Sequence, residues 1–396
     1  MSWVYQLNGK LDVDALARAV DDVVARHDML RVRFERGPDG TTEQVVTPFR
    51  PGVLQIVHLD DRPKAQGLVA ALKAIETEYL DMSPWDDARL QATLYLIAPK
   101  TNVLAVFVAE AAVDGESGTL VASELSRAFA SHAGRPAPEL PEPTDESYLR
   151  YVLDHPVPEA TRERSERHWQ ERMALPRTAG RWPTATGDRR QVRFFKIPVA
   201  EWEQMVRGVP ALGSSPFVVM LSWFELALAE VAGAERFSVT SAVSRRRPAT
   251  RGMIGNFVGP VRLDAEVHAG ERLEDVSPRV VNALRDAVAH SAVPVPLAEA
   301  WAAAPAPYAP PQPLVSFFVF TEREGLDLPG VRQRRFRLHM GTTDVLRVNC
   351  TPDEEGGRNF FFSSSSAPME LLDELVAAFR SYLDAAAAAG APSGAP

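Results

Sequence analysis

The spacing of apolar residues along the first third of the chain predicts a mixed α/β arrangement. A short apolar strand at residues 4–7 precedes a helix that begins near Asp12, whose carboxylate can accept from the free amides of the first turn. Apolar residues recur at helical spacing along residues 16–24, so one face of this helix should be buried. Residues 103–108 are continuously apolar, which is typical of a fully buried central strand, and a helical pattern follows through Phe129.

The rest of the chain repeats this mixture after a segment rich in proline and acidic residues at 133–147. Such a segment is typical of a linker, so we expect an N-terminal lobe over residues 1–147 and a C-terminal lobe over residues 148–396. In the second lobe the pattern predicts strands and helices at 192–197, 199 onward, 217–228, 237–243, 314–320, 360–363 and 371–383. The predicted fold class is therefore α/β, with two lobes of the same kind.

Composition narrows the class of protein. Of the 396 residues, 45% are hydrophobic and 24% are charged, as in an ordinary globular chain, and the formal charge of −9 argues against a nucleic-acid partner. Cys350 is the single cysteine, which excludes an internal disulfide and a metal site built from cysteines. No apolar run is long enough to span a membrane and no secretory leader is visible, so we expect a cytoplasmic protein without a membrane partner.

The richest group of polar side chains follows the apolar strand that ends at residue 108. Glu110 and Asp114 lie four residues apart in an expected loop, and Gly115 relaxes its turn. In a desolvated cavity, Glu110 could act as a base. The alternative is a solvated glutamate at a strand end, with Asp114 at a helix start or in a salt bridge. These residues alone favour that alternative.

A series of motifs along the chain gives this loop a context. In chain order they are GKLDVDAL at 9–16, RHDMLRVRF at 26–34, EAAVDGES at 110–117, HWQERM at 168–173, SRRRP at 244–248, MIGNFV at 253–258 and DVL at 344–346. Together they resemble the condensation domains of nonribosomal peptide synthetases, whose motifs include R-H-x-x-L-R-x-x-F, H-H-x-x-x-D-G, G-R-x-x-P and M-x-G-x-F. The order and spacing of these segments carry the resemblance, because each segment alone is a weak signal.

The resemblance implies a fold, partners and a chemistry. The family folds into two lobes like chloramphenicol acetyltransferase, which form a V-shaped pseudo-dimer with a central tunnel. Carrier proteins bring acyl groups into that tunnel on phosphopantetheine arms, and the second histidine of the H-H-x-x-x-D-G motif helps an amine attack the thioester. We therefore expect acyl or peptidyl carrier proteins as partners, an amine or alcohol as acceptor, and no bound cofactor or metal.

The resemblance also assigns structural roles. Asp114 corresponds to the motif's aspartate and Arg26 to the arginine that pairs with it in the family, so we expect a buried ion pair between them. Breaking such a pair from one side costs roughly 3–5 kcal/mol. Gly115 and Arg31 belong to the same two motifs, and we expect them to be structural as well.

The chain departs from the family at the centre of the motif, where Ala109 and Glu110 replace the two histidines. Three functions then remain open. The first is a free-standing or excised enzyme that forms an amide or ester from carrier-bound acyl thioesters, with Glu110 as the catalytic residue. The second is a silent module that docks carriers or recruits a tailoring enzyme, and the third is a tunnel repurposed for a reaction such as cyclisation. A residue at the second position that can still exchange a proton favours the enzyme.

Other polar residues are weaker candidates. Arg245, Arg246 and Arg247 are candidates for contact with an acidic carrier protein or a phosphopantetheine phosphate, although a solvated basic loop fits equally well. His290 and His339 are isolated, because no serine or carboxylate stands at a spacing that indicates a triad or a metal site.

Overall fold

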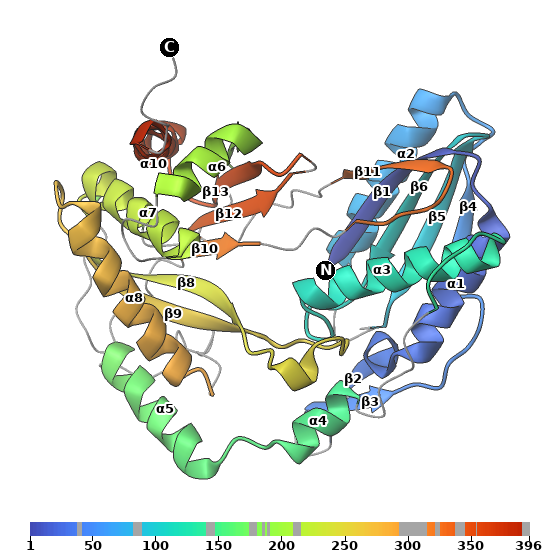
Figure 1. The fold of residues 1–396 in the computed structure, drawn as a ribbon, viewed down its shortest axis with the longest axis horizontal. Coiled ribbons are helices and arrows are strands. Elements are labelled where there is room, and N and C mark those ends of the chain that lie inside the picture. Colours follow the sequence, from blue (N-terminus) through green and yellow to red (C-terminus); the bar gives the residue numbers. More distant parts are fainter. Residues whose placement is uncertain are drawn as a thin grey trace. The chain divides into compact units, whose positions relative to one another are not determined.

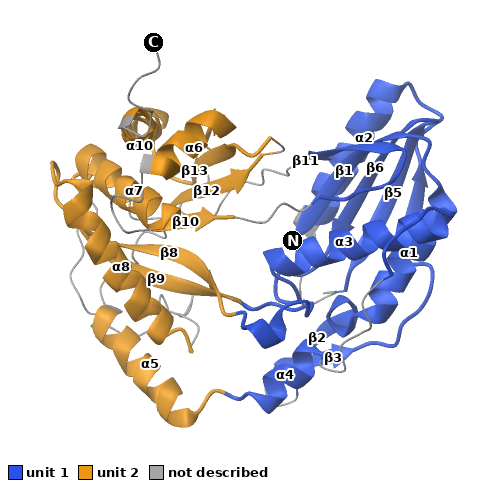
Figure 2. Ribbon diagram, in the orientation of Figure 1, with its two compact units in different colours: residues 1–156, 246–257, 322–339 blue, residues 157–245, 258–321, 340–396 orange. Residues whose placement is uncertain are grey.

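The computed structural model describes residues 1–37, 42–81, 89–139, 147–173, 180–183, 187, 191–208, 215–292, 315–320, 325–336, 345–353 and 355–389. The chain divides into two compact units, which Figure 2 colours separately. Unit 1 comprises residues 1–156, 246–257 and 322–339, and unit 2 comprises residues 157–245, 258–321 and 340–396. Two late segments of the chain therefore complete the unit that contains the N-terminus.

The sheet of unit 1 has five strands in the order β11-β1-β6-β5-β4 (Figure 1). Their bounds are Ser2–Gly9 for β1, Leu54–His58 for β4, Gln91–Ala98 for β5, Thr101–Phe107 for β6 and Val331–Phe336 for β11. β6 lies in the middle, antiparallel to β1 and β5, and all of its residues are buried, as the apolar run predicted. β4 is parallel to β5 at one edge, and β11 is antiparallel to β1 at the other.

Helices cover both faces of this sheet. α1 and α3 pack on one face, where they share a core with Leu7, Leu94 and Leu104, and α2 packs on the opposite face. The predicted start of α1 is confirmed, since the Asp12 Oδ1 accepts from the Ala15 amide at 2.9 Å. The remaining bounds in unit 1 are α1 Val13–Arg26, η1 Asp28–Arg31, β2 Val32–Arg36, β3 Thr42–Val46, α2 Lys64–Asp81, α3 Gly115–His132, α4 Tyr148–Asp154 and η3 Pro248–Thr250.

Unit 2 has a six-stranded sheet in the order β7-β13-β12-β10-β8-β9. β10 is parallel to β8 and β12, and the other neighbours are antiparallel. The strand bounds are Gln191–Ile197 for β7, Arg236–Ser244 for β8, Val258–Glu266 for β9, Val315–Val319 for β10, Leu346–Pro352 for β12 and Arg358–Ser364 for β13. The helix bounds are Glu159–Met173 for α5, Val199–Gly208 for α6, Pro216–Ala232 for α7, Leu273–Ala289 for α8 and Met369–Ala389 for α10.

The core of unit 2 lies between one face of its sheet and the helices α6, α7, α8 and α10. The aromatic rings of Phe317, Phe360 and Phe362 point to that face and surround Phe379 of α10. Along α7, one carboxylate stands in this apolar setting: Glu225 is only 3% exposed. Burial raises the pKa of Glu225 to about 8, while the charge of Arg279 acts in the opposite direction.

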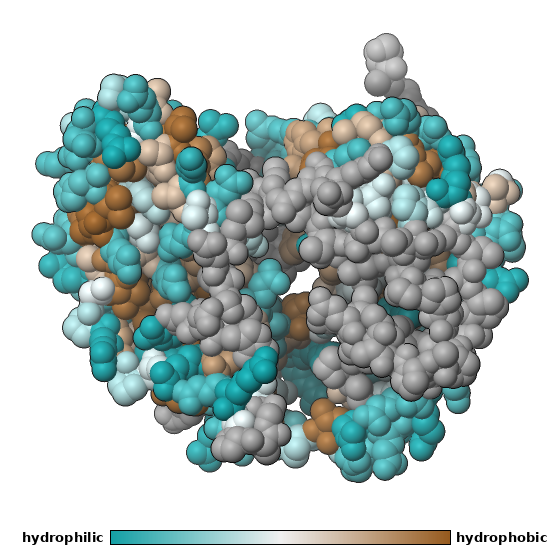
Figure 3. Space-filling model, turned by 180° about the vertical axis from the view of Figure 1, so that it is seen from behind, coloured by the Kyte–Doolittle hydropathy of each residue, from teal (hydrophilic) through white to brown (hydrophobic). Residues whose placement is uncertain are grey.

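The surface is mixed in character. Hydrophilic residues cover most of the described part of the face that Figure 3 shows, with smaller apolar patches among them. Among the described residues, no helix combines the length and the apolar character that crossing a membrane requires. The mixed α/β class predicted from the sequence is confirmed in both units.

Candidate functional site

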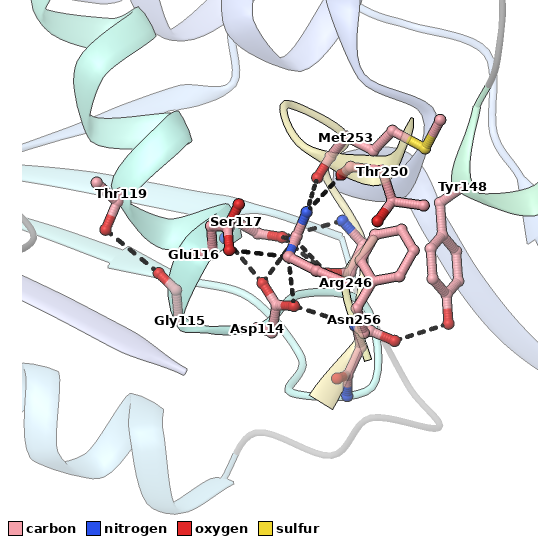
Figure 4. A network of polar contacts seen from close by, with 12 residues as sticks. Asp114, Gly115, Glu116, Ser117, Thr119, Tyr148, Arg246, Thr250, Met253 and Asn256 are labelled. Atoms are coloured by element: carbon pink, nitrogen blue, oxygen red, sulfur yellow. Dashed lines mark hydrogen bonds and ion pairs between the residues drawn. The ribbon is translucent and has the colours of Figure 1, made fainter. Parts of the chain in front are cut away.

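The loop between β6 and α3 is held by the side chain of Asp114 (Figure 4). Asp114 has an extended backbone and caps α3, since its Oδ1 accepts from the Ser117 amide at 2.8 Å. The other carboxylate oxygen accepts from the Phe257 amide at 3.1 Å. The residue is 3% exposed, so this carboxylate is fully withdrawn from water and needs a cation beside it.

Arg246 supplies that cation. Its Nη2 lies 2.8 Å from the Asp114 Oδ1 and its Nε lies 3.1 Å from the Oδ2, which is a bidentate pairing. The Nη1 donates to the carbonyl oxygens of Thr250 at 2.9 Å and Met253 at 3.0 Å, and the guanidinium stacks 4.3 Å from the centroid of Phe257. The side chain of Arg246 is 4% exposed, so both members of this ion pair are buried.

The segment 246–257 is fixed to the loop by further contacts, all within unit 1. Ser117 Oγ donates to the carbonyl of Gly255 at 2.7 Å and accepts from its amide at 3.0 Å. Tyr148 donates to the carbonyl of Asn256 at 2.9 Å, and its ring meets that of Phe257 edge to face. We call these residues, with Asp114 and Arg246, the Asp114–Arg246 network.

Gly255 is required by the close approach of Tyr148. A Cβ at this position would lie 2.2 Å from the Tyr148 Cδ2, and the ring is held by its own hydrogen bond and ring contact. We therefore expect Gly255→Ala to lower the free energy of unfolding by about 1–3 kcal/mol, as overpacking does elsewhere. Thermal and urea unfolding measure the change.

A matched control for that prediction lies in the same unit. Gly325 has open space where a Cβ would lie and no positive φ, so Gly325→Ala should change stability by no more than about 0.5 kcal/mol. Equal unfolding midpoints for the two variants would contradict the packing that we describe around Tyr148.

Glu110, the predicted catalytic residue, lies in the same loop but outside the buried network. Its backbone carbonyl accepts from the Asn256 Nδ2 at 2.7 Å, which fixes the main chain at this position. The side chain of Glu110 is exposed, and no described residue forms a hydrogen bond or an ion pair with its carboxylate. Ala109 beside it is buried. The described residues of unit 1 thus do not supply the desolvation on which a glutamate base would depend.

The pairing of Asp114 with Arg26 that the motif implied is wrong. Arg26 is the last residue of α1, and its Nε lies 3.3 Å from the Glu124 Oε2 on α3, where His27 also contacts that oxygen at 2.7 Å. Glu124 is itself buried, and α1 packs along α3, so Arg26 reaches the middle of that helix instead of its N-terminus.

The other predicted structural residues lie near these contacts. Gly115 is the first residue of α3, directly after the cap. Arg31 donates to the carbonyl oxygens of Val24 at 3.1 Å and Thr47 at 2.9 Å and pairs with Asp28, so it joins α1, η1 and the segment after β3.

The three consecutive arginines separate. The side chain of Arg246 is buried, and its guanidinium is bound within the Asp114–Arg246 network. It therefore cannot contact a carrier protein. Arg245 and Arg247 are exposed, with the guanidinium of Arg245 packed over Gly259. Contact with a carrier or a phosphate stays a prediction for these two residues.

His290 is not isolated, contrary to the sequence-based expectation. Its ring stacks on that of His168 with centroids 3.8 Å apart, and Asp286 lies beside both rings. The spacing of Asp286 and His290, four residues apart on one helix face, was the available signal. His339 lies outside the described residues.

Known proteins resemble this chain over most of its length. The family model "Condensation domain" matches residues 1–299. Chondramide synthase of Chondromyces crocatus is 26% identical over 309 residues, which cover 74% of this chain and 8% of that protein. The chain therefore spans a small part of this curated relative.

Solved structures show the same fold. The X-domain from teicoplanin biosynthesis, solved in complex with OxyB, has a TM-score of 0.73 at 21% identity, over 98% of this chain and 88% of that one. The first condensation domain of the CDA synthetase also has a TM-score of 0.73, at 20% identity over 99% and 91% of the two chains. Since the family match covers well over half of the sequence and the fold agrees with it, the chain belongs to the condensation-domain family of nonribosomal peptide synthetases.

Proposed function

We propose that this chain works in nonribosomal peptide biosynthesis as a binding module, which holds a carrier-bound acyl thioester without performing proton transfer on it. One observation carries the proposal: a buried ion pair holds the loop of the motif, whereas Ala109 and Glu110 stand at the two positions of its histidines. Asp114 and Arg246 keep the loop in place, while Ala109 is buried and Glu110 points an unpartnered carboxylate outward among the described residues.

Physical chemistry supports the loss of proton transfer. Alanine has no titratable group. A general base also needs a second group that orients it. No described residue has that relation to Glu110. A scaffold that retains a costly buried ion pair is still able to present a surface or a cavity for binding.

The fold comparison supports a binding role by analogy. The teicoplanin X-domain was solved as a complex with OxyB, so that domain binds another protein. At 21% identity the likeness covers the fold alone, and function depends on the site. For the present chain the partner that we propose is a carrier protein, and the candidate contacts are Arg245 and Arg247, two exposed arginines of the 244–248 segment.

A second candidate function is amide or ester formation. It is favoured by the hydrogen bond from Asn256 to the Glu110 carbonyl, because a fixed main chain holds the carboxylate near the position of the motif's second histidine. In that reaction the nucleophile bonds to the thioester carbon, the C–S bond breaks, and the nucleophile's proton ends on the thiol. Aligning two tethered substrates can itself supply several kcal/mol.

Binding of loaded carriers tests the proposal. Carrier proteins encoded near this chain would be loaded with a panel of acyl groups through stable amide analogues of the thioester, and their affinities measured by fluorescence anisotropy. We expect at least one acyl-loaded carrier to bind more tightly than the same carrier with a free phosphopantetheine thiol. Failure of every loaded carrier to bind would contradict the proposal.

The basic loop provides a matched pair of variants. Arg245→Glu together with Arg247→Glu should weaken carrier binding about tenfold or more at low salt, because the carrier surface is acidic. Arg332→Glu together with Arg334→Glu, which reverses two exposed arginines on β11, should leave the affinity unchanged. Equal losses in both variants would assign the effect to net charge instead of to this loop.

A further inference from the structure

Two histidines and one carboxylate meet in unit 2, at the contact between α5 and α8 (Figure 1). His168 lies on α5, Asp286 lies in the last turn of α8, and His290 caps that helix at its C-terminus. One potential ligand atom from each side chain lies within 4.8 Å of the other two. The His168 Nε2 is 3.4 Å from the Asp286 Oδ2, and a tetrahedral ion with bonds of about 2.0–2.1 Å places its ligand atoms about this far apart.

The histidines are held by neighbours of the kind that support metal ligands. The His290 Nδ1 lies 3.0 Å from the Asp286 carbonyl oxygen, so Nδ1 donates and the Nε2 keeps the lone pair. The Trp169 indole donates to the His290 carbonyl at 3.0 Å, and its ring meets that of His168 edge to face.

The electrostatics of this position favour a cation. The C-terminus of α8 carries the negative end of its helix dipole, and Asp286 adds a full negative charge. In the structure without an ion, Arg172 forms an ion pair with this carboxylate, and its Nη2 lies 2.9 Å from the Asp286 Oδ2. Its Nη1 is 3.9 Å from the Asp264 Oδ2, so this half-exposed side chain has a second carboxylate within reach.

We propose that His168, Asp286 and His290 form a binding site for a borderline divalent metal ion such as Zn²⁺. Two imidazoles and a carboxylate are a ligand set that zinc takes with water in the fourth position. A pocket of about 570 Å³, which Arg172 and Asp286 line, adjoins the site on the side of Asp286.

Two side chains move when the ion binds. The rings of His168 and His290 are nearly parallel, at 5° to each other, so one ring turns until both lone pairs converge. Arg172 leaves Asp286 for Asp264, because the ion takes its place. The bound ion then links α5 to α8. Its ligands His168 and Asp286 are more than a hundred residues apart in the sequence.

Titration with zinc tests this site. The full chain, freed of any affinity tag and treated with a chelator, would be titrated with ZnCl₂ by calorimetry and with CoCl₂ by visible absorption, which reports tetrahedral coordination. We expect one ion per chain and a higher unfolding temperature. His168→Gln and His290→Gln should each weaken binding by about tenfold or more, whereas His268→Gln, an exposed histidine of unit 2, should not change it.

Arg172→Ala gives a test that does not depend on the folding of the histidine variants. Removing the competing guanidinium should tighten zinc binding severalfold, an effect that a purely structural cluster would not show. Three results would overturn the site: no stoichiometric binding by the wild type, binding that survives both histidine substitutions, or an affinity that Arg172→Ala leaves unchanged.

Discussion

Asp114→Ala is expected to lower the free energy of unfolding by about 3–5 kcal/mol, one of the two largest effects that we predict. The substitution leaves the guanidinium of Arg246 buried without its carboxylate, and it also removes the cap of α3 and the acceptor for the Phe257 amide. Urea unfolding followed by fluorescence and circular dichroism measures the change. Asp114→Asn keeps the shape and part of the hydrogen bonding, so its loss should be smaller.

Two controls separate the ion pair from general damage to the loop. Glu116 also approaches the Arg246 Nε, at 3.5 Å, but its side chain is 43% exposed, so Glu116→Ala should cost less than about 1 kcal/mol. In the double variant Asp114→Ala with Arg246→Leu, no unpaired charge remains, and the loss should be less than the sum of the two single losses. Additive losses would mean that the two residues stabilise the fold independently.

Glu225 is expected to make the stability of the chain fall between about pH 4.5 and pH 8. Burial raises its pKa to about 8 in the folded chain, from 4.5 for the free side chain. The folded chain therefore keeps a proton on Glu225 that the unfolded chain releases. The contribution of Glu225 to the free energy of unfolding is complete below pH 4.5 and is lost as the pH rises towards 8. A difference of this size corresponds to about 5 kcal/mol.

Glu225→Gln removes that contribution while it keeps the size of the side chain. The variant should be more stable than the wild type near pH 8, and the two should converge near pH 4.5. Glu230→Gln, an exposed position on the same helix, provides the control and should follow the wild-type profile. Parallel pH profiles for Glu225→Gln and the wild type would show that Glu225 is not protonated in the folded chain.

Local patterns predicted the elements of the fold, because each depends on neighbours in sequence. The apolar run of β6 and the Asp12 cap are examples. For Asp114 the sequence left a helix cap and a salt bridge open, and in the structure the residue forms both. Pairing between distant segments was not predictable in the same way. The pattern of apolar and polar residues in β11 does not indicate that this strand pairs with β1 in the sheet of unit 1 and not with strands that are nearer in the sequence.

The candidate site shows the same limit. In a run of three arginines, the sequence does not reveal which guanidinium turns inward, and the choice of Arg246 depends on how the backbone enters η3. The motif pointed to the loop and its aspartate, but not to the partner of the aspartate, and the replacement of two histidines by Ala109 and Glu110 stays a prediction. Likewise, His168 and His290 are brought together only by the packing of α5 on α8.

Product formation is the most direct measurement of the proposed role. Wild-type protein and Glu110→Gln would be incubated with a carrier-bound acyl donor that is known to bind and with amine and alcohol acceptors, and products counted by mass spectrometry. We predict that neither protein forms amide or ester above the rate without protein, while both bind the loaded carrier equally. An amide or ester that forms with the wild type and disappears with Glu110→Gln would contradict the proposed role and establish Glu110 as the catalytic residue.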